Sequence, residues 1–132
     1  LFAVDGSRDI VIVQTHPLIR EGAPRNAADI TARINEINFN ASLLAELRAI
    51  EFVGRLLDQD RLPPERYRKM LVHAITADKP LADLSLSTKF NTEWSFLSDL
   101  KDRGRTAADA WLADCGSCIG VKSSVDLKVG FP

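Results

Sequence analysis

The spacing of hydrophobic residues predicts one long helix around which the chain is organised. From residue 26 to about residue 60, apolar side chains recur at steps of three or four, which is typical of one apolar helix face. Asn26 is placed to cap the first turn, with Asp29 three residues later in the capping-box position. Pro63 and Pro64 prevent the helix from continuing, so we expect a helix about 50 Å long. The apolar face consists of Ile30, Ile34, Ile37, Ala41, Leu44, Leu47, Ile50, Val53 and Leu57.

A second apolar strip lies beside the first in the same helix. Its members are Phe39, Leu43, Phe52 and Leu56. A helix that is apolar on more than one side is expected to be sandwiched between other elements.

Two short apolar runs predict strands on either side of this helix. Residues 10–13 (IVIV) are β-branched and continuously apolar, which favours a strand buried on both faces. Residues 70–76 (MLVHAIT) fit a second strand. The order strand, helix, strand predicts parallel pairing if both strands share a sheet. Alternation of apolar and polar residues over 125–131 makes the tail a candidate edge strand.

The C-terminal third predicts two shorter helices. The first is capped by Asn91 or Thr92, carries Trp94, Leu97 and Leu100 on one face, and is expected to stop at Gly104. Thr106 and Asp109 repeat the capping-box spacing before a last helix with Trp111 and Leu112. The expected fold class is α/β and helix-dominated, with a sheet of two or three strands, one long helix and two shorter C-terminal helices.

Composition and charge narrow the class of protein. A chain of 132 residues with 45% hydrophobic content fits one globular domain spanning 1–132. With 17 basic and 18 acidic residues interspersed, the net charge of −1 offers no basic footprint for nucleic acid. No apolar run approaches the roughly 20 residues of a membrane span. Because the chain starts at Leu1 without an initiator Met or a signal-peptide pattern, we expect a piece of a longer chain.

Two cysteines form the most conspicuous local motif, C-x-x-C. Cys115 and Cys118 are too few and too close for a secreted disulfide framework, so a reducing, cytoplasmic setting is expected. A redox pair would need a helix N-terminus to lower the thiol pKa, whereas this motif follows a helix. A zinc site would need two further ligands. We interpret the cysteines as an incidental pair in a helix-terminal loop.

The G-x-C-x-G pattern over residues 116–120 resembles a nucleophile elbow, but it follows a helix where the elbow requires a strand.

His16 follows the first predicted strand, where α/β proteins place ligands, although His-Pro is more typical of a turn. His73 is interpreted as a satisfied core or edge residue. Asp5-Gly6 is interpreted as a turn, although a D-G step can hold a catalytic Asp.

The remaining polar and aromatic candidates have structural interpretations. Ser123 and Ser124 with Asp126 are too close together for a triad and are expected to be solvated or capping residues. Trp94 and Trp111 are expected to anchor the core. The helix asparagines either bond a neighbouring loop or face water; they are Asn35, Asn38 and Asn40. We therefore predict no catalytic, cofactor-binding or metal-binding residue, and no cofactor.

The chain as a whole resembles the C-terminal region of bacterial patatin-like phospholipases. The similarity runs over nearly all 132 residues and is most specific in INEINFNASLLAELRAI and FNTEWSFL. RDIVIVQTHPLIREGAPRN and SSVDLKV extend it towards the two ends.

The resemblance implies a lipolytic acyl hydrolase on an α/β sheet, with a Ser–Asp dyad and an oxyanion loop. This chain has no G-x-S-x-G and no glycine-rich loop, and Asp5-Gly6-Ser7 departs from the family's D-G-G. The dyad is therefore expected upstream, and the 132-residue chain alone is expected to be inactive. Its expected partners are the N-terminal catalytic part of its own parent chain and, through exposed apolar faces, further copies of itself. A lipid substrate is expected for the parent only. The alternative is an independent helical interaction module without catalysis.

Overall fold

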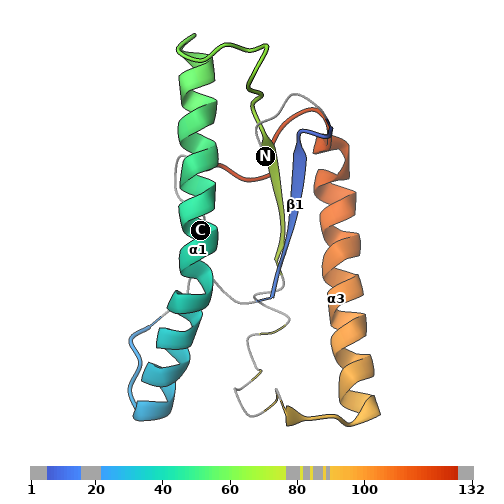
Figure 1. The fold of residues 1–132 in the computed structure, drawn as a ribbon. Coiled ribbons are helices and arrows are strands. Elements are labelled where there is room, and N and C mark those ends of the chain that lie inside the picture. The colour runs from blue at the N-terminus through green and yellow to red at the C-terminus, as the bar shows by residue number, and fades with distance from the viewer. Residues whose placement is uncertain are drawn as a thin grey trace.

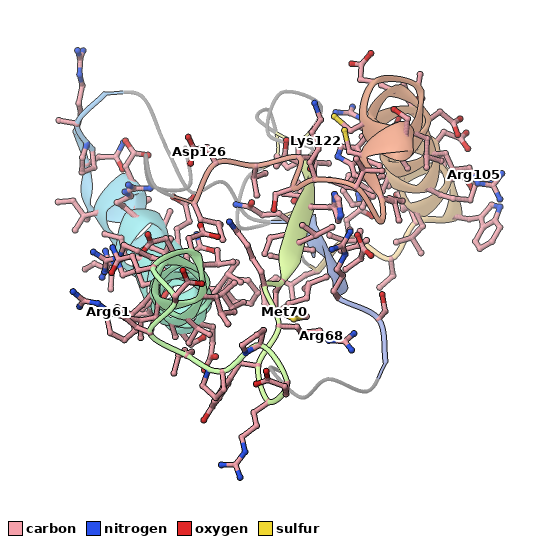
Figure 2. All side chains as sticks on the ribbon, turned by 90° about the horizontal axis from the view of Figure 1, so that it is seen from above. Arg61, Arg68, Met70, Arg105, Lys122 and Asp126 are labelled. Carbon is pink, nitrogen blue, oxygen red and sulfur yellow. The ribbon has the colours of Figure 1, made fainter. Side chains whose placement is uncertain are left out.

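The protein is a helix-dominated α/β structure in which two strands lie between two long helices. The computed structural model describes residues 6–15, 22–76, 81, 84, 88 and 90–127. Figure 1 shows the strands between α1 and α3, and Figure 2 shows the same order of layers from above. The expected fold class is thereby confirmed. In chain order, the elements are β1 (Asp9–Gln14), α1 (Ala27–Asp58), β2 (Leu71–Thr76), α3 (Trp94–Cys115) and the 3₁₀ helix η2 (Gly116–Cys118).

The two strands pair in parallel, as the strand–helix–strand order predicts. The register sets Ile10 opposite Val72 and Val11 opposite His73. Because successive side chains alternate between faces, Ile10 and Val72 share one face of the sheet, and Val11 and His73 share the other.

The core lies on the face of the sheet that α1 covers. Its buried centre joins the second half of α1 to β2, and Met70 lies between α1 and the strands in Figure 2. The buried members are Leu47, Ile50, Met70 and Val72, and the partly buried residues packed on them are Ile10, Ile12, Leu43, Val125 and Leu127.

The long helix begins and ends as the sequence indicates, but its buried face is different. Asn26 caps the helix, with its side-chain oxygen accepting from Asp29 N at 2.9 Å. The buried positions are Glu36, Asn40, Leu47, Ile50 and Gly54. The first three isoleucines of the predicted face, Ile30, Ile34 and Ile37, are instead about half exposed. The physical reason is that the N-terminal turns of α1 extend past the end of both strands, so those strands cannot cover them (Figure 1).

The prediction that the first strand is buried on both faces is wrong for β1. Val11 is 46% exposed and Val13 is 70% exposed, although Gln14 on the opposite face is buried. In β2, by contrast, residues 71–74 are all buried. The cause is position, because β2 lies between β1 and the 123–125 segment while β1 is at the rim of the described sheet.

The prediction of two C-terminal helices is also wrong, because α3 runs without a break through Gly104. Glu93 is the N-cap residue and makes no side-chain capping bond, while Asn91 accepts from Glu93 N at 2.9 Å. The hydroxyl of Thr106 donates to the carbonyl of Asp102 at 2.9 Å instead of capping a new helix. A helical glycine costs only about 1 kcal/mol relative to alanine, which is too little to end a helix of this length.

The tail packs on β2 without forming a strand over its described residues. Ser124 N donates to Val72 O at 3.0 Å, and Val125 and Leu127 join the core. The rest of the predicted edge strand lies outside the described residues, as do Asp5 and His16.

We expect Leu47→Ala to lower the free energy of unfolding by about 2–4 kcal/mol, because Leu47 is a buried member of the core. Leu112→Ala is the matched control, since Leu112 is 54% exposed on α3 and its loss leaves no cavity. Urea unfolding of both variants measures the difference. Equal losses would show that the core has been placed wrongly.

The continuity of α3 predicts that Gly104→Ala raises the free energy of unfolding by about 0.5–1 kcal/mol. A Cβ at Gly104 meets nothing within 4 Å, so alanine adds helix propensity without a clash. The contrasting variant is Gly120→Ala, which we expect to be destabilising because Gly120 has φ +75°. Thermal unfolding with far-UV circular dichroism measures both. A destabilised Gly104→Ala protein would mean that the helix is broken there.

Candidate functional site

The most connected polar cluster of the described chain surrounds a buried histidine in the centre of the sheet. His73 Nε2 lies 2.9 Å from Asp9 Oδ1, and the His73 side chain has no exposed surface. Asp9 pairs with Leu71, two positions before His73, so both side chains are on the same face of the parallel pair. The Asp9 side chain is 14% exposed, which leaves it at the margin of solvent.

The same carboxylate also holds the loop that follows α3. Gly120 N donates to Asp9 Oδ1 at 2.7 Å, and the guanidinium of Arg8 donates to the carbonyl of Gly120. The Gly120 hydrogen bond and the His73 hydrogen bond hold the pKa of Asp9 below its ordinary value, and the nearby charges of His73 and Arg8 add to this against a smaller opposing effect of burial. Asp9 therefore joins β1, β2 and the loop after η2.

Trp111 completes the cluster from α3. Its ring meets His73 edge to face, with 5.9 Å between ring centroids. Trp111 therefore packs against the buried strand on the α3 side, but it is only partly buried and does not belong to the apolar core under α1. The prediction of a core anchor is wrong for Trp94, which is 80% exposed at the start of the helix.

The cluster has the parts of an acid–base pair without access to a substrate. His73 is fully buried, and its Nδ1 has no hydrogen-bond partner among the described residues, so no hydroxyl or thiol is in line to be activated. The hydroxyl of Ser7, near Asp9, accepts from Asp9 N at 3.1 Å. His73 is therefore a buried residue of the sheet, and the interpretation as a satisfied residue holds for Nε2, which Asp9 pairs, but not for Nδ1.

The two serines of the tail bind the backbone of β2. Ser123 Oγ accepts from Val72 N at 3.0 Å, and Ser124 Oγ accepts from Ala74 N at 3.4 Å. Their hydroxyls replace the strand that would otherwise occupy this edge, which is a role that the sequence interpretation did not anticipate. Asp126 is exposed, and no triad forms.

The cysteines lie where the sequence places them, at the C-terminal end of a helix. Cys115 is the last residue of α3 and Cys118 the last of η2, and both are free thiols. The 116–120 pattern therefore follows a helix, which does not fit a nucleophile elbow. Within the described ranges, no three His, Cys, Asp or Glu side chains come together in a way that could hold a metal ion.

The asparagines of α1 differ in burial, and two of the three face water as one of the expected alternatives has it. Asn40 is buried on the inner face of α1, whereas Asn35 and Asn38 are exposed.

Asp9 and Gly120 are the cluster residues that sequence reasoning does not find. The only local signal is a charged pair, Arg8-Asp9, directly before an apolar strand. Nothing in the sequence relates Asp9 to a glycine 111 residues further along the chain, because that pairing depends on how α3 returns to the sheet.

Comparison of the chain with protein-family models, with curated proteins and with solved structures finds no match. Among the described residues, no helix combines the length and the apolar character needed to cross a bilayer.

The lowered pKa of Asp9 predicts how its contribution to stability depends on pH. The folded state favours the carboxylate, so this contribution is complete above the unfolded pKa of about 4 and is lost as pH falls through the lower folded value. We expect Asp9→Asn to be less stable than the parent chain at pH 7 and to lose less stability on acidification below about pH 4. Asp114→Asn, on the exposed side of α3, is the control. Urea unfolding at a series of pH values tests this, and parallel curves for Asp9→Asn and the parent chain would contradict it.

Proposed function

We propose that this chain is the C-terminal structural portion of a patatin-like lipolytic acyl hydrolase. In this proposal it completes and covers a larger α/β sheet, and the Ser–Asp dyad belongs to an upstream part of the parent. The support is of two kinds, namely the resemblance of the long-helix sequence to that family and the asymmetry of the sheet.

The asymmetry of the sheet is the observation that carries the proposal. On the β2 side, Ser123 and Ser124 occupy the backbone groups that would bind a further strand. On the β1 side, Val11 and Val13 are exposed, and the described residues provide no strand beyond β1.

Parallel sheets are normally covered on both faces, and a long apolar edge invites further pairing. In this proposal further strands of the parent pair with β1 at the end of the described sheet, and the layer that covers them also covers Val11 and Val13, which point out of one face.

The chemistry in such a parent is acyl transfer. The serine attacks the ester carbonyl, and backbone N–H groups stabilise the oxyanion that develops. In this proposal the parent supplies these groups. The Asp9–His73 pair of this chain is engaged in holding the strands and the loop together. This chain contributes the scaffold, and a cytoplasmic location goes with its two free thiols.

We expect the 132-residue chain to show no turnover of a short-chain p-nitrophenyl ester, and a protein translated from the upstream-extended reading frame to hydrolyse it. Replacing the serine of an upstream G-x-S-x-G by alanine is expected to abolish that hydrolysis. Val13→Lys in the longer protein is expected to lower its soluble yield, since Val13 would then be buried against the added strands.

Two outcomes would refute the proposal. One is robust turnover by the 132-residue chain that Asp5→Ala abolishes. The other is an upstream reading frame that encodes neither a G-x-S-x-G nor a D-G-G or D-G-A step.

A further inference from the structure

The two free thiols lie on either side of a single 3₁₀ turn. Cys115 is the N-cap residue of η2 and Cys118 is its last residue. In a 3₁₀ helix, side chains three residues apart eclipse each other, and three steps of about 2.0 Å set their Cα atoms about 6 Å apart. A disulfide spans Cα atoms that are roughly 4.4–6.8 Å apart. The local fold therefore places the two cysteines at a separation that a disulfide can bridge.

Both cysteines also keep part of their surface exposed. Reaction with a small disulfide molecule requires such access.

The loop that follows the 3₁₀ turn joins it to the sheet. The carbonyl of Cys118 accepts from Val121 N and from Lys122 N, each at 2.9 Å, which makes a tight turn. Inside this turn, Gly120 N donates to Asp9 Oδ1 at 2.7 Å, and Figure 1 shows the end of α3 beside the start of β1. Cys118 is therefore held on one side by η2 and on the other by contacts between the loop and β1.

We propose that Cys115 and Cys118 are a site of reversible oxidation, at which a low-molecular-weight disulfide converts the two thiols into one intrachain disulfide that restrains the loop after α3. A catalytic redox pair precedes a helix, whereas this pair follows one, so the site is regulatory and does not exchange the disulfides of other proteins. Disulfides of proteins in reducing compartments are usually transient, and redox sensing is one of their roles.

The reaction consists of two thiol–disulfide exchanges. One cysteine thiolate attacks a sulfur of glutathione disulfide, whose S–S bond breaks, so that a mixed disulfide forms and one glutathione thiolate leaves. The second cysteine thiolate attacks the protein sulfur of the mixed disulfide, which forms the Cys115–Cys118 bond and releases the second glutathione thiolate. The chain loses two electrons, glutathione disulfide gains them, and the two thiol protons pass through solvent to the released thiolates.

Equilibration with glutathione tests the proposal. The 132-residue chain is incubated with known ratios of glutathione and glutathione disulfide and quenched by alkylation, and mass spectrometry measures the intrachain disulfide. We expect its equilibrium constant to be at least about tenfold larger in the folded chain than in concentrated urea, because the fold holds the two thiols together before they react. By linkage, the oxidised chain is expected to unfold at a higher urea concentration than the reduced chain.

Hydrogen exchange tests the effect on the loop. We expect the amides of Val121 and Lys122 to exchange several-fold more slowly in the oxidised chain, because the disulfide restrains the turn that they close. The amides of residues 31–35 are the internal control, since the first turns of α1 lie at the opposite end of the molecule from η2 (Figure 1).

Cys115→Ser and Cys118→Ser are the matched variants, because each leaves one thiol in place. Each is expected to take up one glutathione as a mixed disulfide and to form no intrachain bond. Neither variant is expected to change the far-UV circular dichroism of the chain, since serine closely matches cysteine in size.

The proposal is overturned if mixed disulfides accumulate on the parent chain without an intrachain bond, or if the disulfide forms between chains. An equal equilibrium constant in the folded and unfolded chain also overturns it, because the pair is then incidental. Equal exchange of Val121 and Lys122 in the two forms overturns the restraint on the loop. These measurements involve neither ester hydrolysis nor an upstream reading frame, so the proposal does not rest on the proposed function.

Discussion

The burial of β2 on both of its faces is the constraint on which the rest of this structure depends. Val72 and Ala74 point into the core under α1, while Leu71 and His73 are buried on the side of α3. An apolar strand in this position stabilises both layers at once, but its buried polar groups then require hydrogen-bond partners, which Nε2 of His73 has and Nδ1 lacks among the described residues. Asp9 meets that requirement for His73 Nε2, and the hydroxyls of Ser123 and Ser124 meet it for two backbone N–H groups.

These polar contacts also explain why the loop after α3 has a defined place. Gly120 is held by Asp9 through its N–H and by Arg8 through its carbonyl, and its positive φ suits a residue without a Cβ. One carboxylate thus connects elements from the two ends of the described chain. The Asp9–His73 pair thus contributes to holding the sheet and the loop together.

The two edges of the described sheet differ. The outer edge of β2 is hydrogen-bonded by the 123–125 segment, whereas no further described strand pairs with β1. The β2 side is closed by backbone and hydroxyl bonds, whereas β1 and the N-terminal turns of α1 expose valines and isoleucines. The edge of a sheet is suited to further strands.

Local pattern determined the elements of this protein. The apolar spacing, the Asn26 cap and the two prolines were enough to place α1, and the β-branched run was enough to place β1, because these signals act between residues close in sequence. Parallel pairing followed from the order of elements.

Tertiary structure alone decided which side of each element is buried. Sequence spacing groups Ile30 with Leu47 on one apolar strip, yet only Leu47 meets the strands, because the first turns of α1 run past them. The meeting of Asp9 with Gly120 likewise depends on packing between distant segments. Local propensity differs by about 1 kcal/mol between such alternatives, so contacts made only in the folded chain decide between them.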